Sequence, residues 1–179
     1  MRWAALLRGV NVGGNRKLPM ADLKGLAEAL GFDRVQTLLA SGNVVFDADE
    51  EDGARLGDRL EREAKARLGL ETDFLLRDAA ELKAAIAANP FAEAAKARPN
   101  TLVVVFMREA PPQDLPKRVA AIYDGPERLA VNGRHLYADY VEGQGRSKLP
   151  QAMARLKLPK AATGRNWNTV LKLAAMIED

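Results

Sequence analysis

The segment RVQTLLASGNVVF holds two apolar, β-branched stretches separated by Ser41-Gly42-Asn43, and amphipathic helical patterns stand on both sides of it. Serine, glycine and asparagine are turn residues, so the segment predicts a β-hairpin. A strand at Trp3–Leu7 precedes the first helix, and TDFLLR follows the second helix as a further strand. The order β-α-β-β-α-β is the split βαβ arrangement, and it predicts a ferredoxin-like lobe.

Apolar periodicity supports both helices of this lobe. The first lies between Pro19 and Gly31, and its apolar residues recur at i, i+3, i+4 and i+7: Leu23, Leu26, Ala27 and Leu30. The second, about Glu51–Leu68, has leucine or alanine at four-residue spacing. Its outer face carries acids four residues before bases, a pattern typical of a solvated helix surface.

The second half of the chain begins the same pattern again. TLVVVFM predicts a buried strand, and RLAVNGRHLYADY predicts a hairpin that turns at Asn132-Gly133. A helix from about Ser147 to Leu156 follows, and a last helix, Asn166–Ile177, stands where the first half has a strand. We therefore predict an α+β fold of two ferredoxin-like lobes, the second degenerate and ending in a helix. The expected boundaries are 1–78 for the first lobe, 79–100 for a helix and connection, and 101–179 for the second.

Composition excludes several classes of site. The chain of 179 residues has no cysteine and one histidine, His135, which excludes disulfides, thiolate chemistry and His-rich metal sites. No apolar run approaches the ~20 residues of a membrane helix, and the start lacks a signal-peptide pattern, so we expect a cytoplasmic protein without membrane association. A net charge of +3 and a pI near 9.3 permit a polyanionic partner. The sequence identifies no cofactor or metal.

Three loops combine glycine or asparagine with cations. RGVNVGGNRK could direct its N–H groups at an anion, although it lacks the Walker and GxGxxG spacings and a plain turn is the alternative. GQGRSKLP places cations at a helix start, where a bound anion would offset their unfavourable interaction with the dipole; the alternative is a simple cap by Ser147. In TGRNWN, Arg165 precedes Asn166, a good N-cap, and Trp167 is expected in the core.

His135, Tyr137 and Asp139 fall on one face of the predicted second-half hairpin, and apolar residues occupy the other face. A solvated sheet face is the favoured interpretation, and a row for acid–base chemistry is the alternative. Ser41 as a nucleophile has little support, because the GxSxG elbow is absent.

The segments ALLRGVNVGGNRKLPMADL, TLLASGNVVF, NPF, GRSKL and TGRNWNTVLKL, in this order, resemble a widespread bacterial family catalogued as domain of unknown function 1697. The resemblance runs from Trp3 to about Ala174. It implies two ferredoxin-like lobes and brings no activity, cofactor or catalytic residue. The polar and glycine residues of these segments are the candidate ligand-binding residues: Arg8, Asn11, Gly13, Gly14, Ser41, Asn43, Arg146, Ser147, Lys148, Arg165, Asn166 and Asn168.

Three functions remain open from the sequence. The first is a binding module for a phosphate-bearing ligand or nucleic acid, through a cleft formed by the three loops. The second is an enzyme acting on a small anionic substrate, with Arg8, Lys148 and Arg165 as the clamp and Ser41, Ser147 or His135 near the reacting atom. The third is a structural or interaction protein whose motif residues cap helices and tie the lobes together. The sequence does not determine the oligomeric state.

Overall fold

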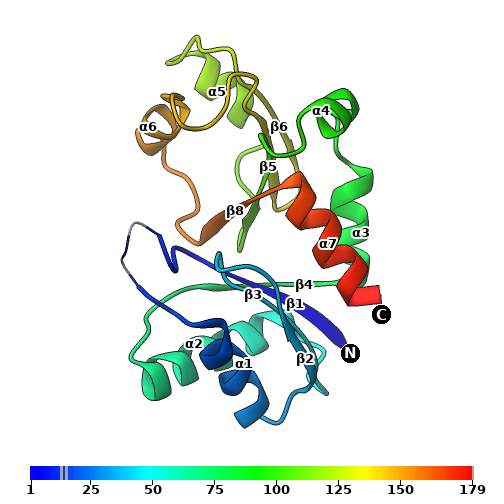
Figure 1. Ribbon diagram of the computed structural model, residues 1–179. Helices are drawn as coiled ribbons and strands as arrows, with labels where there is room; N and C mark the ends of the chain where they lie inside the picture. The colour runs from blue at the N-terminus through cyan, green and yellow to red at the C-terminus, as the bar shows by residue number, and fades with distance from the viewer. Residues whose placement is uncertain (13, 15, 179) are drawn as a thin grey trace. The chain divides into compact units, whose positions relative to one another are not determined.

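The computed structural model describes residues 1–12, 14 and 16–178, and it divides the chain into two compact units (Figure 1). One unit contains Met1–Lys83 and the segment from Lys172 onward; the other contains Ala84–Leu171. The boundaries fall within two helices, α3 (Ala79–Ala87) and α7 (Trp167–Glu178).

The first unit is a four-stranded antiparallel sheet in the order β2-β3-β1-β4, with two helices on one face. Its elements are β1 (Arg2–Leu7), α1 (Met20–Ala29), β2 (Asp33–Thr37), β3 (Asn43–Asp47), α2 (Gly53–Leu68) and β4 (Phe74–Asp78). Alternate β1 residues, Trp3 and Leu7 among them, pack against Leu23 of α1 and Leu60 of α2 in one apolar core. The predicted helix faces are confirmed.

The second unit has the same sheet order, β6-β7-β5-β8. Its elements are α4 (Ala92–Ala97), β5 (Leu102–Met107), α5 (Leu115–Ala120), β6 (Arg128–Asn132), β7 (His135–Asp139), α6 (Leu149–Ala154) and β8 (Ala162–Asn166). One sheet face packs against Leu115 and Val119 of α5 and Leu149 of α6. The predicted α+β fold of two ferredoxin-like lobes is confirmed.

A strand absent from the sequence prediction closes the second sheet. The lobe ends in a helix, as expected, but β8 precedes that helix and pairs with β5 through Val104↔Arg165 and Phe106↔Thr163. The β8 sequence ATGRN has little β propensity, because alanine, glycine and asparagine are depleted in strands. Pairing with the buried strand β5 therefore decides its conformation.

The hairpin face with His135, Tyr137 and Asp139 is buried, so the prediction of a solvated face is wrong. All three residues are at most 8% exposed. The Tyr137 hydroxyl donates a hydrogen bond to the carbonyl of Ala85 in α3, and burial raises the pKa of Tyr137 to about 12. A two-residue turn at Asn132-Gly133 predicts Val131 opposite Arg134, whereas the hairpin pairs Val131 with Leu136. This shift of two residues leaves each side chain on its predicted face.

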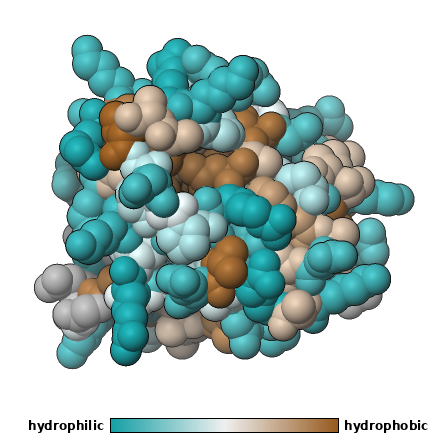
Figure 2. Space-filling model, turned by 90° about the horizontal axis from the view of Figure 1, so that it is seen from above, coloured by the Kyte–Doolittle hydropathy of each residue, from teal (hydrophilic) through white to brown (hydrophobic). Residues whose placement is uncertain are grey.

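Among the described residues, none of the helices combines the length and apolar character needed to span a lipid bilayer. Exposed large apolar residues are few among those that the structure describes. Figure 2 shows apolar side chains in small groups bordered by hydrophilic ones on the face that it draws.

Candidate anion-binding site

Asn11 fastens the loop after β1 to the turn between β2 and β3. Its Nδ2 atom donates hydrogen bonds to the carbonyls of Leu18, at 2.9 Å, and Ala40, at 2.7 Å. Its Oδ1 atom accepts one from the Leu18 N–H at 2.7 Å. One amide side chain thus fixes two loops that are distant in sequence.

The turn between β2 and β3 packs closely against the loop after β1. A Cβ atom at Gly42, where φ is +88°, would lie 2.6 Å from Val10 Cγ2, so only glycine fits there without a shift. The buried Asn43 donates through Nδ2 to the carbonyl of Leu38 at 2.8 Å and to Ser41 Oγ at 3.1 Å. The structure therefore brings Asn11, Ser41 and Asn43 together, and each contributes to holding the two loops.

These two loops concentrate backbone strain. Four non-glycine residues among those described have positive φ, and three lie in these loops: Asn11 at +54°, Arg16 at +49° and Leu39 at +60°. The left-handed region costs an ordinary L-residue about 1–2 kcal/mol, and asparagine tolerates it best. Arg16 and Leu39 are exposed, so the fold gains no buried side chain at either position. Strain of this kind concentrates at functional sites.

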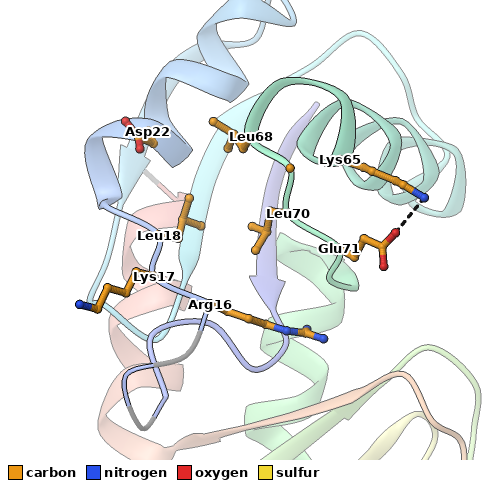
Figure 3. Close-up of a pocket in the computed structure, with 9 residues that line it drawn as sticks. Arg16, Lys17, Leu18, Asp22, Lys65, Leu68, Leu70 and Glu71 are labelled. Carbon is orange, nitrogen blue, oxygen red and sulfur yellow. Dashed lines mark ion pairs between the residues drawn. The ribbon is translucent and has the colours of Figure 1, made fainter.

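Two adjoining pockets separate the loop after β1 from the α2–β4 connection, and they share Arg16, Lys65 and Glu71. The first, here named the Lys17 pocket, has a volume of about 600 Å³ and is lined by Arg16, Lys17, Leu18, Asp22, Leu70 and Glu71, among others. The second, the Arg8 pocket, has a volume of about 610 Å³ and is lined by Arg8, Arg16, Asp58, Arg62, Glu71 and Asp73, among others. In Figure 3, the Arg16 side chain extends from the loop toward the Leu70–Glu71 segment.

Cations and carboxylates are mixed in both pockets, and ion pairs neutralise some of them. Lys65 Nζ lies 2.8 Å from Glu71 Oε1. The Lys65 hydrogen bond is the main cause that lowers the pKa of Glu71, and the Arg16 charge adds to it.

Three cations of the pockets, Arg16, Lys17 and Arg62, form no ion pair within 4 Å in the part of the chain that the structure describes. Two lining carboxylates, Asp22 and Asp58, likewise form no ion pair with the described residues. Glu61 also lines the Arg8 pocket, where its Oε1 atom accepts the Phe74 N–H at 3.0 Å, so the two linings together hold as many carboxylates as cations.

Arg8 is held against the start of β4. Its Nη1 atom lies 3.2 Å from Asp73 Oδ2, and its N–H donates to the Asp73 carbonyl at 3.1 Å. The Thr72 hydroxyl donates to the Arg8 carbonyl. These contacts give Arg8 a structural role, and its ligand-binding role stays a prediction. Gly14 has a φ of +78°, as expected for a glycine turn, whereas Gly13 lies outside the described residues.

Ser147 stabilises the start of α6, as expected. Its hydroxyl oxygen accepts from the Leu149 N–H at 3.1 Å, while its proton is donated to Glu127. Tyr123 donates to the other Glu127 oxygen at 2.7 Å. Burial alone would raise the pKa of Glu127, but the hydrogen bonds from Ser147 and Tyr123 outweigh it and lower that pKa. Arg146 and Lys148 are exposed and form no ion pair with a described residue.

The residues around the start of α7 serve the fold of the second unit. Asn166 Oδ1 accepts from the Thr169 N–H at 3.0 Å, which confirms the predicted N-cap, and Trp167 is buried as expected. Arg165 is 6% exposed and donates to Thr163 Oγ1 at 2.7 Å; burial lowers its pKa to about 10. Asn168 donates to Asn100 Oδ1 at 2.7 Å.

The first predicted loop belongs to the first unit and the other two belong to the second. The cleft that would join all three stays a prediction. Within residues 1–12, 14 and 16–178, no three histidine, aspartate or glutamate side chains are grouped so that they could hold a metal ion.

The chain belongs to the family described as Protein of unknown function (DUF1697), which matches residues 1–137. A structure described as that of the conserved bacterial protein SP0830 from Streptococcus pneumoniae is similar over 98% of each chain, at 25% identity and a TM-score of 0.71. No curated protein matches the sequence. The comparisons thus give the family and the fold.

Proposed function

We propose that the protein binds a phosphate-bearing ligand at the two pockets that meet at Arg16. The observation that carries this proposal is the state of Arg16 itself. Its backbone is held at a φ of +49°, its side chain is exposed, and its guanidinium lines both pockets without an ion pair to any described residue. A strained position whose guanidinium has no ion-pair partner within 4 Å among the described residues is best explained by a ligand that contacts it.

The chemistry of the lining supports a phosphate. A guanidinium presents N–H groups in a planar fork that fits two phosphate oxygens, and Lys17 and Arg62 each add a positive charge to one of the two pockets. Arg8 and Lys65 are paired with carboxylates, which weakens their attraction for an anion but holds the walls in place. Asp22 and Asp58 favour a ligand that also carries hydrogen-bond donors, so a bare anion is the weaker fit.

The test is isothermal titration calorimetry of the protein with inorganic pyrophosphate and with adenosine monophosphate, at low and at moderate salt. Arg16→Gln removes the guanidinium, and Arg155→Gln, an exposed arginine of the other unit, is the matched control for loss of one charge. We expect Arg16→Gln to weaken binding about tenfold or more and Arg155→Gln to leave it unchanged. Absence of binding to the unaltered protein, or equal binding by Arg16→Gln, would overturn the proposal.

A structural role is the second candidate function for the remaining motif residues. It is favoured by the contacts of Asn11, Asn43, Ser147 and Asn166, each of which satisfies backbone or side-chain groups of the fold. Alanine at Asn11 should then lower the melting temperature by several degrees, because one change releases both loops. An unchanged melting temperature would contradict this role.

A further inference from the structure

Two exposed apolar side chains project from the loops that Asn11 fastens together. Val12 is 63% exposed and Leu39 is 49% exposed. Val12 follows Asn11 directly, and Asn11 bonds to the carbonyl of Ala40, the residue after Leu39. The hydrogen bond therefore holds the two apolar residues in neighbouring loops of one unit.

Leu39 contributes little to the fold. Half of its surface is in water, and its φ of +60° is one that leucine rarely adopts. Glycine would adopt this backbone without strain, and asparagine would adopt it with less strain than leucine. An apolar side chain kept at a strained and exposed position points to a contact outside the chain.

Positive charge lies beside these apolar residues. Arg16 is close to Val12, because the Asn11 N–H donates to the Arg16 carbonyl at 3.0 Å and closes the loop between them. Arg16 and Lys17 are both exposed and form no ion pair with any residue that the structure describes. The partner must therefore offer negative charge and apolar surface close together.

We infer that the partner is single-stranded nucleic acid, whose phosphates contact Arg16 and Lys17 while Val12 and Leu39 pack on the faces of its bases. This inference rests on the proposed function and names the phosphate-bearing ligand as a polymer. A single strand exposes both phosphates and base faces, whereas a duplex hides its base faces by stacking. Apolar side chains are known to press against base faces where nucleic acid is unstacked.

The experiment measures fluorescence anisotropy with a labelled oligothymidine, and with the same strand in a duplex, at two salt concentrations. Leu39→Gly removes the apolar side chain and relieves its backbone; Val141→Ser, at an exposed apolar residue of the other unit, is the control. We expect Leu39→Gly to weaken single-strand binding about fivefold without changing its salt dependence. Arg16→Gln should instead reduce the log–log salt slope by about 0.7, the value of one phosphate contact.

Stability measurements separate loss of contact from loss of fold. The unfolding midpoint of Leu39→Gly should equal or exceed that of the unaltered protein, so that the variant folds at least as well and binds less well. Leu39→Asn, which also tolerates this backbone, should show the same weakened binding. Unchanged binding by both Leu39 variants, or equal affinity for duplex and single strand, would overturn the inference.

Pyrophosphate binding distinguishes this inference from the proposal on which it rests. If the protein binds pyrophosphate through Arg16 but not the oligonucleotide, the single-strand inference fails and the phosphate site stands. If it binds neither pyrophosphate, nor adenosine monophosphate, nor the oligonucleotide, both fail.

Discussion

The two lobes have a buried arginine and a helix-capping residue at the same register positions of their sheets. Arg77 stands opposite Ala4 in the first, and Arg165 stands opposite Val104 in the second, each on the closing strand and each buried. The next residue of each closing strand, Asp78 or Asn166, accepts a hydrogen bond from the N–H three residues further on and caps the following helix.

A carboxylate that binds two arginines is also repeated. Asp47 on β3 pairs with Arg2 and Arg34, and Asp139 on β7 pairs with Arg98 and Arg128. The lobes differ in burial, because the Asp47 side chain is 27% exposed and that of Asp139 is fully buried. These repeated residues therefore stabilise the fold that the two lobes share, here named the frame.

The difference between the lobes lies in their loops. All non-glycine residues with positive φ in the described chain belong to the first lobe, and so do the two pockets at Arg16. The second lobe has the same frame without such strain among the residues that the structure describes. The two lobes therefore share their strand order and polar contacts, and they differ in the loops of the first lobe.

The largest expected effect tests the repeated carboxylate. Asp139→Asn leaves two guanidinium groups without their buried counter-charge, so we expect the free energy of unfolding to fall by about 3 kcal/mol. Asp47→Asn, at the more exposed copy, should cost about 1 kcal/mol or less. Urea unfolding of the two variants measures both values, and equal losses would contradict the burial difference between the lobes.

Acid titration gives a second readout of the same pair. The hydrogen bond from Arg98, with that from Arg128, holds the pKa of Asp139 below its usual 3.8. Because the pKa of this carboxyl is lower in the folded than in the unfolded protein, its charge stabilises the fold at pH values above the unfolded-state pKa. This stability is lost as the pH falls through the folded-state pKa. Asp139→Asn should remove this part of the acid dependence.

The next largest effect is a loss of stability at alkaline pH, which we expect from one residue of the second lobe. Tyr137 has a pKa of about 12 because it is buried, and its register counterpart in the first lobe is Val45, which does not titrate. Because the pKa of Tyr137 is higher in the folded than in the unfolded protein, its contribution to the free energy of unfolding is present below pH 10. This contribution, on the order of 2 kcal/mol, is lost between about pH 10 and pH 12. Tyr137→Phe should flatten this loss in unfolding experiments across that range; an unchanged slope would count against it.

The smallest effect tests the two helix caps. Asp78→Ala and Asn166→Ala should each lower the free energy of unfolding by about 1 kcal/mol, because each leaves an N–H at a helix start without its partner. In Asp78→Ala the backbone N–H of residue 78 keeps its hydrogen bond to Glu81, at 3.0 Å, so only the side-chain cap is lost, as in Asn166→Ala. Thermal unfolding compares the two, and a neutral Asn166→Ala would show that the caps are not equivalent.

The fold was predictable where local pattern and tertiary packing agree. The hairpin at Ser41-Gly42-Asn43, the periodic helices and the Asn166 cap all follow from short-range spacing. Strand β8 did not, because ATGRN is extended only through its pairing with β5. The burial of His135 and Tyr137 escaped the sequence for a similar reason, since alternation shows which residues share a face but not what covers it.

The candidate site was only partly visible in the sequence. The glycines and the cation pair Arg16-Lys17 marked the first loop, and the structure adds Arg62, Lys65 and Glu71 from across the pockets. Lys65 follows Glu61 by four residues, the spacing that predicts an ion pair on a solvated helix face, but it pairs with Glu71 instead. The sequence around Leu39 does not predict its positive φ, because this backbone angle depends on the contact between two loops that are distant in sequence.

The hydrogen bond from Arg2 Nε to the carbonyl of Met176, at 3.2 Å, joins the first strand to the last helix inside the first unit. During synthesis, the ribosome therefore releases all of Ala84–Leu171 before it releases the segment that completes the unit begun at Met1. The lobe that starts first is finished last. A chain truncated after Leu171 should therefore lack the Arg2–Met176 hydrogen bond and be cleaved by proteases in its amino-terminal lobe faster than the full chain.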